Sequence, residues 1–308
     1  KFRNLVRQYY RQHYPLTAES YSDPYLNPGN GFVSRVCHEP IVGLAVLYQM
    51  MAVPRAAGLL DIRLKRKPTS VDCRNDRVHS VTLLNMNEGV EETVEAEYVL
   101  DATELGDLLP LAGIEYVTGS ESQSETGEPH AIVGEAQPDN VQSITWSIAV
   151  GYDPEGHHVI DRPDQYDYWS SYHPSLTPPW DGPLFTWDIL RHEKGRSWVQ
   201  HRTLFPDEAR NLDDSLWIHR RVVSSDRFQP GTVPHDVTMV NAWQNDYFLH
   251  SIIDKPEEDV AVYLEEARQL SLSWLYWLQT ESPRADGGTG WPGLYPRPDI
   301  VGSPDGLA

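Results

Sequence analysis

Hydrophobic residues recur at every third or fourth position in two stretches near the N-terminus. The first runs from Phe2 to Tyr9, with arginines on the opposite side, and predicts a short basic helix. The second runs from about residue 40 to residue 51 and predicts another helix, with Pro54 beyond its end because proline interrupts the helical hydrogen bonds. Between the two helices, the proline, glycine and asparagine residues of 27–31 indicate a turn.

A longer helix is predicted near the C-terminus. Asp254 is expected to cap it together with Glu257, and Pro256 falls in the first turn, where the missing N–H costs nothing. From residue 260 to residue 278 the apolar positions follow helical spacing, and Pro283 ends the pattern. Since the last two turns are apolar on all sides, we expect that end of the helix, including Trp274 and Leu278, to be buried.

The period changes to two between residues 59 and 101. Leu60, Ile62 and Leu64 alternate with charged residues, as in a half-buried strand. Residues 78–83 and 91–96 continue the alternation as an antiparallel meander, with a turn over 85–89. The apolar run 98–100 then predicts a buried strand of a parallel sheet.

Beyond a Gly-, Ser-, Glu- and Pro-rich excursion over 115–140, the chain reads mostly as strands. Residues 185–191 and 197–202 flank the tetrapeptide 193–196, which predicts a hairpin. No internal repeat is evident.

Four segments, in chain order, resemble one family of proteins. They cover 27–40, 101–113, 276–281 and 292–308. The most informative is the strand that ends in Asp101-Ala102-Thr103-Glu104, preceded by a hairpin strand that begins near Thr93. On these residues the chain resembles the FAD-dependent oxidoreductases related to glutathione reductase and p-hydroxybenzoate hydroxylase.

The resemblance implies an α/β + β fold. An incomplete Rossmann-like FAD-binding domain would be interrupted by a largely antiparallel substrate domain. The expected division is 1–113 for the partial FAD-binding domain, 114–290 for the substrate domain, and 291–308 for the start of the return to the FAD-binding domain. The implied function is that of a flavin-dependent oxidoreductase, which moves a hydride between FAD and a small organic substrate.

The resemblance also implies which residues meet the cofactor. Ala102 and Thr103 would line the dinucleotide crevice at the carboxyl edge of the sheet, followed by Glu104 and Gly106. Glu104 stands where related flavoproteins usually have glycine, so a carboxylate would approach the crevice. Pro68, interpreted as the end of a strand, would offer a backbone C=O but no N–H to adenine, or it would simply end an edge strand.

The sequence departs from the family in two places. After residue 308 nothing supplies the Gly-rich strand and helix with which the family's FAD-binding domain closes over the flavin, and the other departure lies near the N-terminus. No G-x-G-x-x-G follows an apolar strand there, since Gly29 and Gly31 lie beside Pro28. The expectation is therefore a fragment of the family's fold that binds FAD weakly or not at all. Such a fragment would expose apolar surface around Val99, Leu100 and the stripe 44–47.

One polar and aromatic cluster is a candidate for substrate contact, formed by Asn241, Trp243, Asn245, Asp246 and Tyr247. Flat rings can stack on a ligand while amides and carboxylates bond to its polar groups. The plainer alternative is a strand end whose rings pack in the core while Asn and Asp make a turn.

The composition of the chain limits the classes of partner that it is expected to bind. The 308 residues carry 25 Lys+Arg and 45 Asp+Glu, a net charge of −20, which disfavours nucleic acid and anionic membranes. Two cysteines cannot form a disulfide framework, no HxxxH or HExxH motif suggests a metal, and no apolar run is long enough for a bilayer. We expect a cytoplasmic protein of undefined oligomeric state that acts on a small molecule.

The aromatic content supports one alternative. Ten Trp and 16 Tyr would also suit a carbohydrate-binding or other non-catalytic module, in which rings exposed on one sheet face stack on sugars.

Overall fold

The structure, a computed structural model, describes residues 1–209 and 211–308 and divides into two compact units. Unit 1 consists of Lys1–Met51, Ser143–Ile252 and Pro256–Ala308, and unit 2 of Ala52–Gln142 and Ile253–Lys255. The predicted functional division at residues 113 and 290 remains a prediction. No helix in the described part of the chain is both long and apolar enough to cross a membrane.

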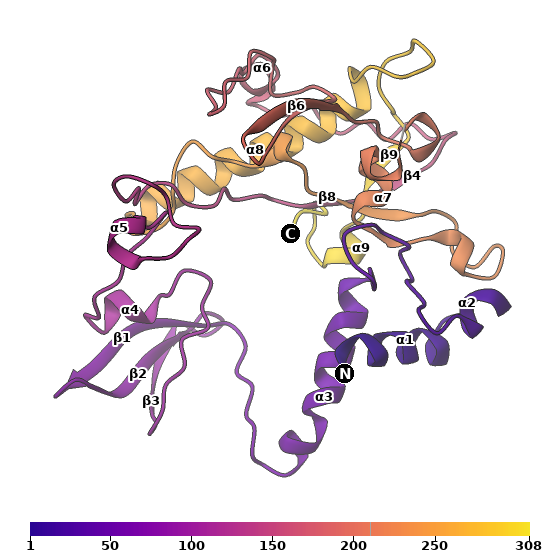
Figure 1. Cartoon of the computed structure of the whole chain (residues 1–308). Coiled ribbons are helices and arrows are strands. Elements are labelled where there is room, and N and C mark those ends of the chain that lie inside the picture. Colours follow the sequence, from indigo (N-terminus) through magenta and orange to yellow (C-terminus); the bar gives the residue numbers. More distant parts are fainter. Residues whose placement is uncertain (210) are drawn as a thin grey trace. The chain divides into compact units, whose positions relative to one another are not determined.

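Unit 1 contains helices and short strands (Figure 1). Its helices are α1 (Phe2–His13), α2 (Ala18–Ser22), α6 (Tyr166–Ser170), α7 (Leu216–His219), α8 (Glu257–Thr280) and α9 (Pro298–Val301), with α3 (Pro40–Ala56) continuing into unit 2. Its strands are β4 (Ile148–Tyr152), β5 (Asp188–Glu193), β6 (Arg196–His201), β7 (Arg221–Val223), β8 (Val237–Val240) and β9 (Leu294–Pro296). The described residues of unit 1 also form the 3-10 turns η1 (Pro206–Glu208), η2 (Leu212–Asp214), η3 (Ser225–Arg227) and η4 (Trp243–Asn245).

Unit 2 is built around a three-stranded meander. Its elements are β1 (Arg66–Arg74), β2 (Arg77–Asn85), β3 (Val90–Glu95), α4 (Leu108–Leu111) and α5 (Gln123–Thr126). The strand pairs in the three sheets of the described chain, with orders β1-β2-β3, β7-β8-β4-β9 and β5-β6, are all antiparallel. A Rossmann-like parallel sheet is therefore what the sequence resemblance implies, not something seen in these elements.

Helix α8 forms the centre of the larger core of unit 1. Trp274 and Leu278 are fully buried in this core, as predicted, and the ring of Trp274 packs with those of Phe185 and Trp187. The predicted start of the helix was wrong: the N-cap is Pro256, not Asp254. Asp254 adopts a left-handed conformation (φ 55°) and accepts a hydrogen bond from the Tyr116 hydroxyl.

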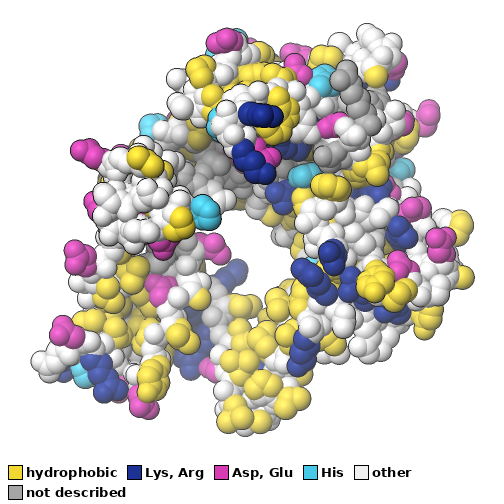
Figure 2. Space-filling model, viewed as in Figure 1, with side chains coloured by type: hydrophobic (Ala, Val, Ile, Leu, Met, Phe, Trp, Pro, Cys, Tyr) yellow, Lys and Arg dark blue, Asp and Glu magenta, His cyan; other side chains and the backbone are white. Residues whose placement is uncertain are grey.

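A second core of unit 1 packs α1 and α3 against the β7-β8-β4-β9 sheet through buried residues such as Val6, Val46 and Val237. Helix α1 forms as predicted. Helix α3 is longer than predicted, because Pro54 lies within its last turns instead of beyond its end. The exposed side of α3 carries Leu44 and Leu47, and Figure 2 shows hydrophobic side chains gathered along this helix.

In unit 2, the meander is predicted correctly but its boundaries are not. Residues 60–64 form no strand, and Leu64 is 64% exposed; the first strand begins at Arg66, after a left-handed residue at Lys65. Among the described hydrophobic residues of this unit, Val81 alone is buried. The meander therefore leaves most of its apolar face uncovered within unit 2.

The Asp236 carboxylate joins β7 to the turn that follows it. Its two oxygens accept hydrogen bonds from Arg221 Nη1 at 2.6 Å and from the N–H of Ser225 at 2.7 Å. Burial on its own would raise the pKa of Asp236. The Ser225 N–H and hydroxyl and the Arg221 charge outweigh burial, so the pKa is lowered.

We expect Asp236→Asn to lower the free energy of unfolding by about 2 kcal/mol near neutral pH, because hydrogen bonds between charged partners are lost. Since the folded-state pKa lies below the unfolded value of about 3.9, the contribution is present above about pH 4 and is lost as the pH falls through the folded pKa. Urea unfolding of both proteins at about pH 7 and about pH 3 measures it. If the two proteins differed as much in their free energy of unfolding at about pH 3 as at about pH 7, the ionised Asp236 carboxylate would not be the source of the stability.

Candidate functional site

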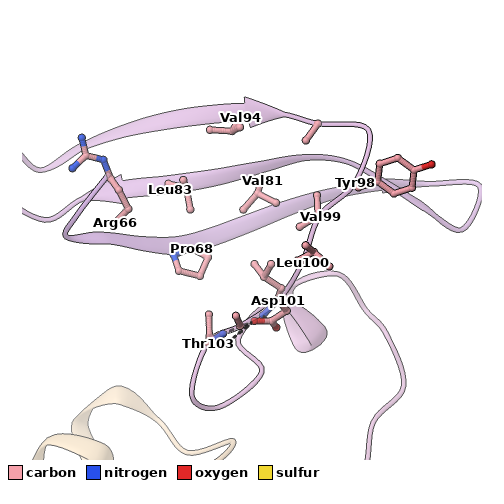
Figure 3. A pocket seen from close by; sticks show the side chains of 13 residues that line it. Arg66, Pro68, Val81, Leu83, Val94, Tyr98, Val99, Leu100, Asp101 and Thr103 are labelled. Carbon is pink, nitrogen blue, oxygen red and sulfur yellow. Dashed lines mark hydrogen bonds between the residues drawn. The ribbon is translucent and has the colours of Figure 1, made fainter. Parts of the chain in front are cut away.

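Unit 2 contains a pocket of about 400 Å³ on one face of the meander (Figure 3). Alternate residues of β2 point the same way because successive side chains of a strand face opposite sides. Val81 and Leu83 therefore share the pocket face with Val94 of β3 and Pro68 of β1. Together they form a flat apolar shelf.

The segment 96–103 closes the pocket along one side, with Leu108 of α4 beside it. Its conformation is held by the carboxylate of Asp101, which accepts hydrogen bonds from the N–H of Thr103 at 2.9 Å, from the Thr103 hydroxyl at 2.8 Å and from the N–H of Leu108 at 3.1 Å. The Thr103 N–H, then the Thr103 hydroxyl, lower the pKa of Asp101, so the carboxylate stays ionised. The loop is thus organised by its own polar groups.

The structure brings together three of the five predicted cofactor residues. Pro68, Ala102 and Thr103 line this pocket, although 34 positions separate Pro68 from Ala102 in the sequence. Glu104 and Gly106 lie in the turn after the pocket and are not among its lining residues. Gly106 takes a left-handed conformation (φ 70°) and starts the turn that leads into α4.

Two local predictions around the pocket were wrong. Residues 98–100 form no buried parallel strand: they lie outside any strand, and Leu100 is 91% exposed. Pro68 does not end a strand but lies within β1, opposite Leu83 and next to a β-bulge. The bulge lets a residue without an N–H remain inside the strand, since the hydrogen-bond ladder is irregular there.

The apolar shelf of this pocket was not predicted from the sequence. The alternation of apolar residues predicts Val81, Leu83 and Val94 as strand residues only, whereas in the structure they form the floor of the pocket. The period-two pattern of β2 places Val81 and Leu83 on one face of the strand, and this is the signal in the sequence that could have indicated the shelf.

The predicted substrate cluster lies in unit 1, around η4. Its amide, carboxylate and hydroxyl groups bond within the fold, whereas the buried indole N–H of Trp243 has no hydrogen-bond partner there. Asn245, which is fully buried, accepts a hydrogen bond from the N–H of Ala242 at 2.8 Å and donates to the carbonyl of Trp146 at 3.1 Å. Asp246 bonds to Thr145, the Tyr247 hydroxyl bonds to Glu266, and Asn241 donates to Ser147. These contacts support the plainer alternative of a core-packed turn, and contact with substrate stays a prediction.

Two other side chains of this cluster, those of Asp246 and Trp243, also pack within the fold. Burial raises the pKa of Asp246 more than the Thr145 hydrogen bond lowers it. The ring of Trp243 lies 6.1 Å from that of Trp180, edge to face, in a half-buried aromatic contact. Because both rings are half-buried, only part of their surface is open to a ligand.

A G-x-G-x-x-G string does occur in the chain, at residues 288–293. It lies between α8 and β9, so it does not lead from a strand into a helix as a phosphate-binding loop would. Its last two glycines permit close backbone contacts. A Cβ at Gly290 would lie 2.4 Å from the Gln279 carbonyl oxygen, and one at Gly293 would lie 2.0 Å from that of Asp153.

The Gly29–Gly31 turn has a similar explanation. A Cβ on either glycine would lie within 2.7 Å of the Arg221 carbonyl oxygen, at the start of β7. Among the described residues, no group of three or more His, Cys, Asp or Glu side chains is placed to hold a metal ion. In the β5–β6 hairpin, His192 lies opposite Ser197 and His201 opposite Asp188, so the two histidines do not face each other.

Comparison with known proteins agrees with the resemblance in the sequence. The model of one family, described as FAD dependent oxidoreductase, matches residues 1–302. No curated protein and no solved structure matches the chain. Because the family match covers nearly the whole sequence, the chain belongs to the FAD-dependent oxidoreductase family, whose cofactor is FAD.

Proposed function

We propose that the pocket of unit 2 takes the adenine end of FAD, and that the protein moves a hydride between this cofactor and a small organic substrate. One observation carries the proposal: Pro68, Ala102 and Thr103, which the family resemblance assigns to the dinucleotide crevice, line a single pocket with an apolar shelf. The family match supplies the cofactor. We also propose that the protein acts in the cytoplasm.

The pocket fits a flat ring and not a pyrophosphate. The side chains of Val81, Leu83 and Val94 make a surface on which a planar heterocycle can lie, and such contact is favourable because it removes apolar area from water. A pyrophosphate in this fold is usually held by free backbone N–H groups at a glycine-rich loop and helix N-terminus. Here the N–H groups of Thr103 and Leu108 donate hydrogen bonds to the Asp101 carboxylate, so they are already used and do not offer themselves to a pyrophosphate.

The residues of the pocket therefore contribute binding and orientation. Asp101 fixes the loop through Thr103, and the shelf would exclude water from one face of a bound ring. The chemistry that FAD supplies when bound is hydride transfer at its flavin ring.

Calorimetric titration with FAD, adenosine and riboflavin tests the placement. We expect FAD and adenosine to bind weakly, with dissociation constants within about tenfold of each other, or about 1.4 kcal/mol, and riboflavin not to compete. Leu83→Asn should weaken both ligands, because it places an amide on the shelf. The matched control is Leu84→Asn, on the same strand and the opposite face.

Two results would contradict this placement. Binding of riboflavin in competition with adenosine would assign the pocket to the flavin ring instead. Unchanged binding of FAD by Leu83→Asn would show that the cofactor lies elsewhere. The reaction is checked separately, by bleaching of the flavin absorbance when small organic reductants are added without air. Failure of every reductant would count against hydride transfer but not against the pocket.

A further inference from the structure

Unit 1 contains a second pocket, of about 540 Å³, on one face of the β5–β6 hairpin. Arg191 lies opposite Trp198, and Glu193 opposite Arg196, in the antiparallel register. Since side chains alternate along a strand, Arg191 and Glu193 share one face with Trp198 and Gln200. All four line the pocket, and Arg202 continues the same row.

The floor of this pocket is a connected row of planar polar groups. Arg191 Nε donates to Gln200 Oε1 at 2.7 Å, and Gln200 Nε2 donates to Asp214 Oδ1 at 2.6 Å. Asn211 donates to the second oxygen of Asp214 at 3.2 Å. The bond to Gln200 uses only one of the five N–H donors of Arg191, and Gln200 keeps one N–H and one lone pair. A ligand with hydroxyl groups can use these remaining donors and acceptors.

The pocket also presents aromatic faces to solvent. Of the ten tryptophans, all of which the structure describes, Trp198 alone is exposed, at 46%. Phe32 is 60% exposed, and its ring stacks on that of His219 with centroids 6.3 Å apart and an interplanar angle of 26°. An exposed ring can stack on a flat face of a ligand, and the contact removes apolar area of both from water.

Apart from the histidines His192 and His219, the charged side chains of the lining balance. Arg191 and Arg202 are matched by Glu193 and Asp214, and Asp214 and Arg202 are both more than nine-tenths buried. The hydrogen bond from Gln200, more than any other contact, lowers the pKa of Asp214, so this carboxylate is ionised near neutral pH. A lining with balanced charge gives no net attraction for a phosphate or a carboxylate.

We propose that this pocket binds a neutral carbohydrate, one or two sugar rings in size. Trp198 and Phe32 provide the stacking surfaces, while Arg191 and Gln200 bond to ring hydroxyls. The volume falls within the usual range of small-ligand pockets, about 300–1,000 Å³. The site belongs to unit 1 and does not depend on whether the pocket of unit 2 binds FAD.

The number of tryptophans in the chain does not indicate this site. Nine of the ten tryptophans are buried or half-buried, so the abundance of Trp reflects the core and not a binding face. The site is indicated instead by the exposed indole of Trp198, which lines the same pocket as the polar row of Arg191, Gln200 and Asp214.

Saturation-transfer difference NMR of the 308-residue protein with cellobiose, maltose and lactose tests the proposal, followed by calorimetry with the best probe. At least one disaccharide should receive saturation. Trp198→Ala should then weaken its binding at least tenfold, and Trp198→Phe should retain most of the affinity, because a phenyl ring still stacks. Val199→Ala is the matched control, since Val199 lies on the same strand with its side chain on the other face and is 55% exposed.

Three outcomes would overturn the proposal. Absence of saturation transfer to all three sugars is the first. Equal affinity of the wild-type protein and Trp198→Ala is the second, with circular dichroism confirming that the variant is folded. The third is preferential binding of glucuronate over the neutral sugars, because that would make the pocket an anion site.

Discussion

Trp274→Ala is expected to reduce the free energy of unfolding by about 3–5 kcal/mol, the usual range for replacing a large buried aromatic residue with alanine. The indole is fully buried near the C-terminal end of α8. It stacks on Trp277 with centroids 4.8 Å apart, and the rings of Phe185 and Trp187 lie 5.4 and 6.0 Å away. Alanine would leave a cavity between three aromatic rings that cannot close without moving the helix.

Urea or guanidinium unfolding, followed by circular dichroism, gives the measurement. Val262→Ala is the control on the same helix: its side chain is 54% exposed, so the change should stay within about 0.5 kcal/mol. A loss below about 1 kcal/mol for Trp274→Ala would mean that α8 does not form the centre of the core.

Gly293→Ala is expected to lower the free energy of unfolding by about 3 kcal/mol, the upper part of the range for overpacking. The glycine precedes β9 where this strand pairs with β4, and its carbonyl accepts a hydrogen bond from Asp153 N–H at 2.9 Å. An added Cβ would lie 2.0 Å from the Asp153 carbonyl oxygen. A backbone atom cannot rotate away as a side chain does, so the two strands would have to separate.

Gly302→Ala separates this clash from a general effect of replacing glycine. Gly302 has a left-handed conformation (φ 76°), and a Cβ there meets nothing within 4 Å. Its replacement should cost only the backbone strain, about 1–2 kcal/mol. If Gly293→Ala left stability unchanged but abolished FAD binding, the string 288–293 would be a phosphate loop after all.

Sequence reasoning was most accurate where the signals are local. The helical spacing of 2–9, the turn signal of 193–196 and the apolar stripe of α8 depend on neighbours only a few positions away, and each element forms. The turn itself is shorter than predicted, because Glu193 and Arg196 belong to the strands. The same reasoning erred at boundaries. The cap assigned to Asp254 failed because that residue takes a left-handed conformation, which places it outside the helix.

The site was harder to predict than the elements. An apolar run such as 98–100 indicates that burial would be favourable, but it does not say what covers it, and Leu100 is largely exposed in the structure. Pro68 and Ala102 come together only through the folding of the meander, which no local pattern encodes. The cluster around Asn245 shows the opposite case, since residues of suitable chemistry use their hydrogen bonds to hold a turn.

The turn of the β5–β6 hairpin has a consequence for how this protein can change during evolution. Two left-handed residues, Lys194 and Gly195, connect the strands and fix Glu193 opposite Arg196. Insertion or deletion of one residue there would shift the register by one position and move Trp198 and Gln200 to the other face together. Substitutions can adjust this surface one side chain at a time, whereas a single-codon length change in the turn would replace its whole chemistry at once.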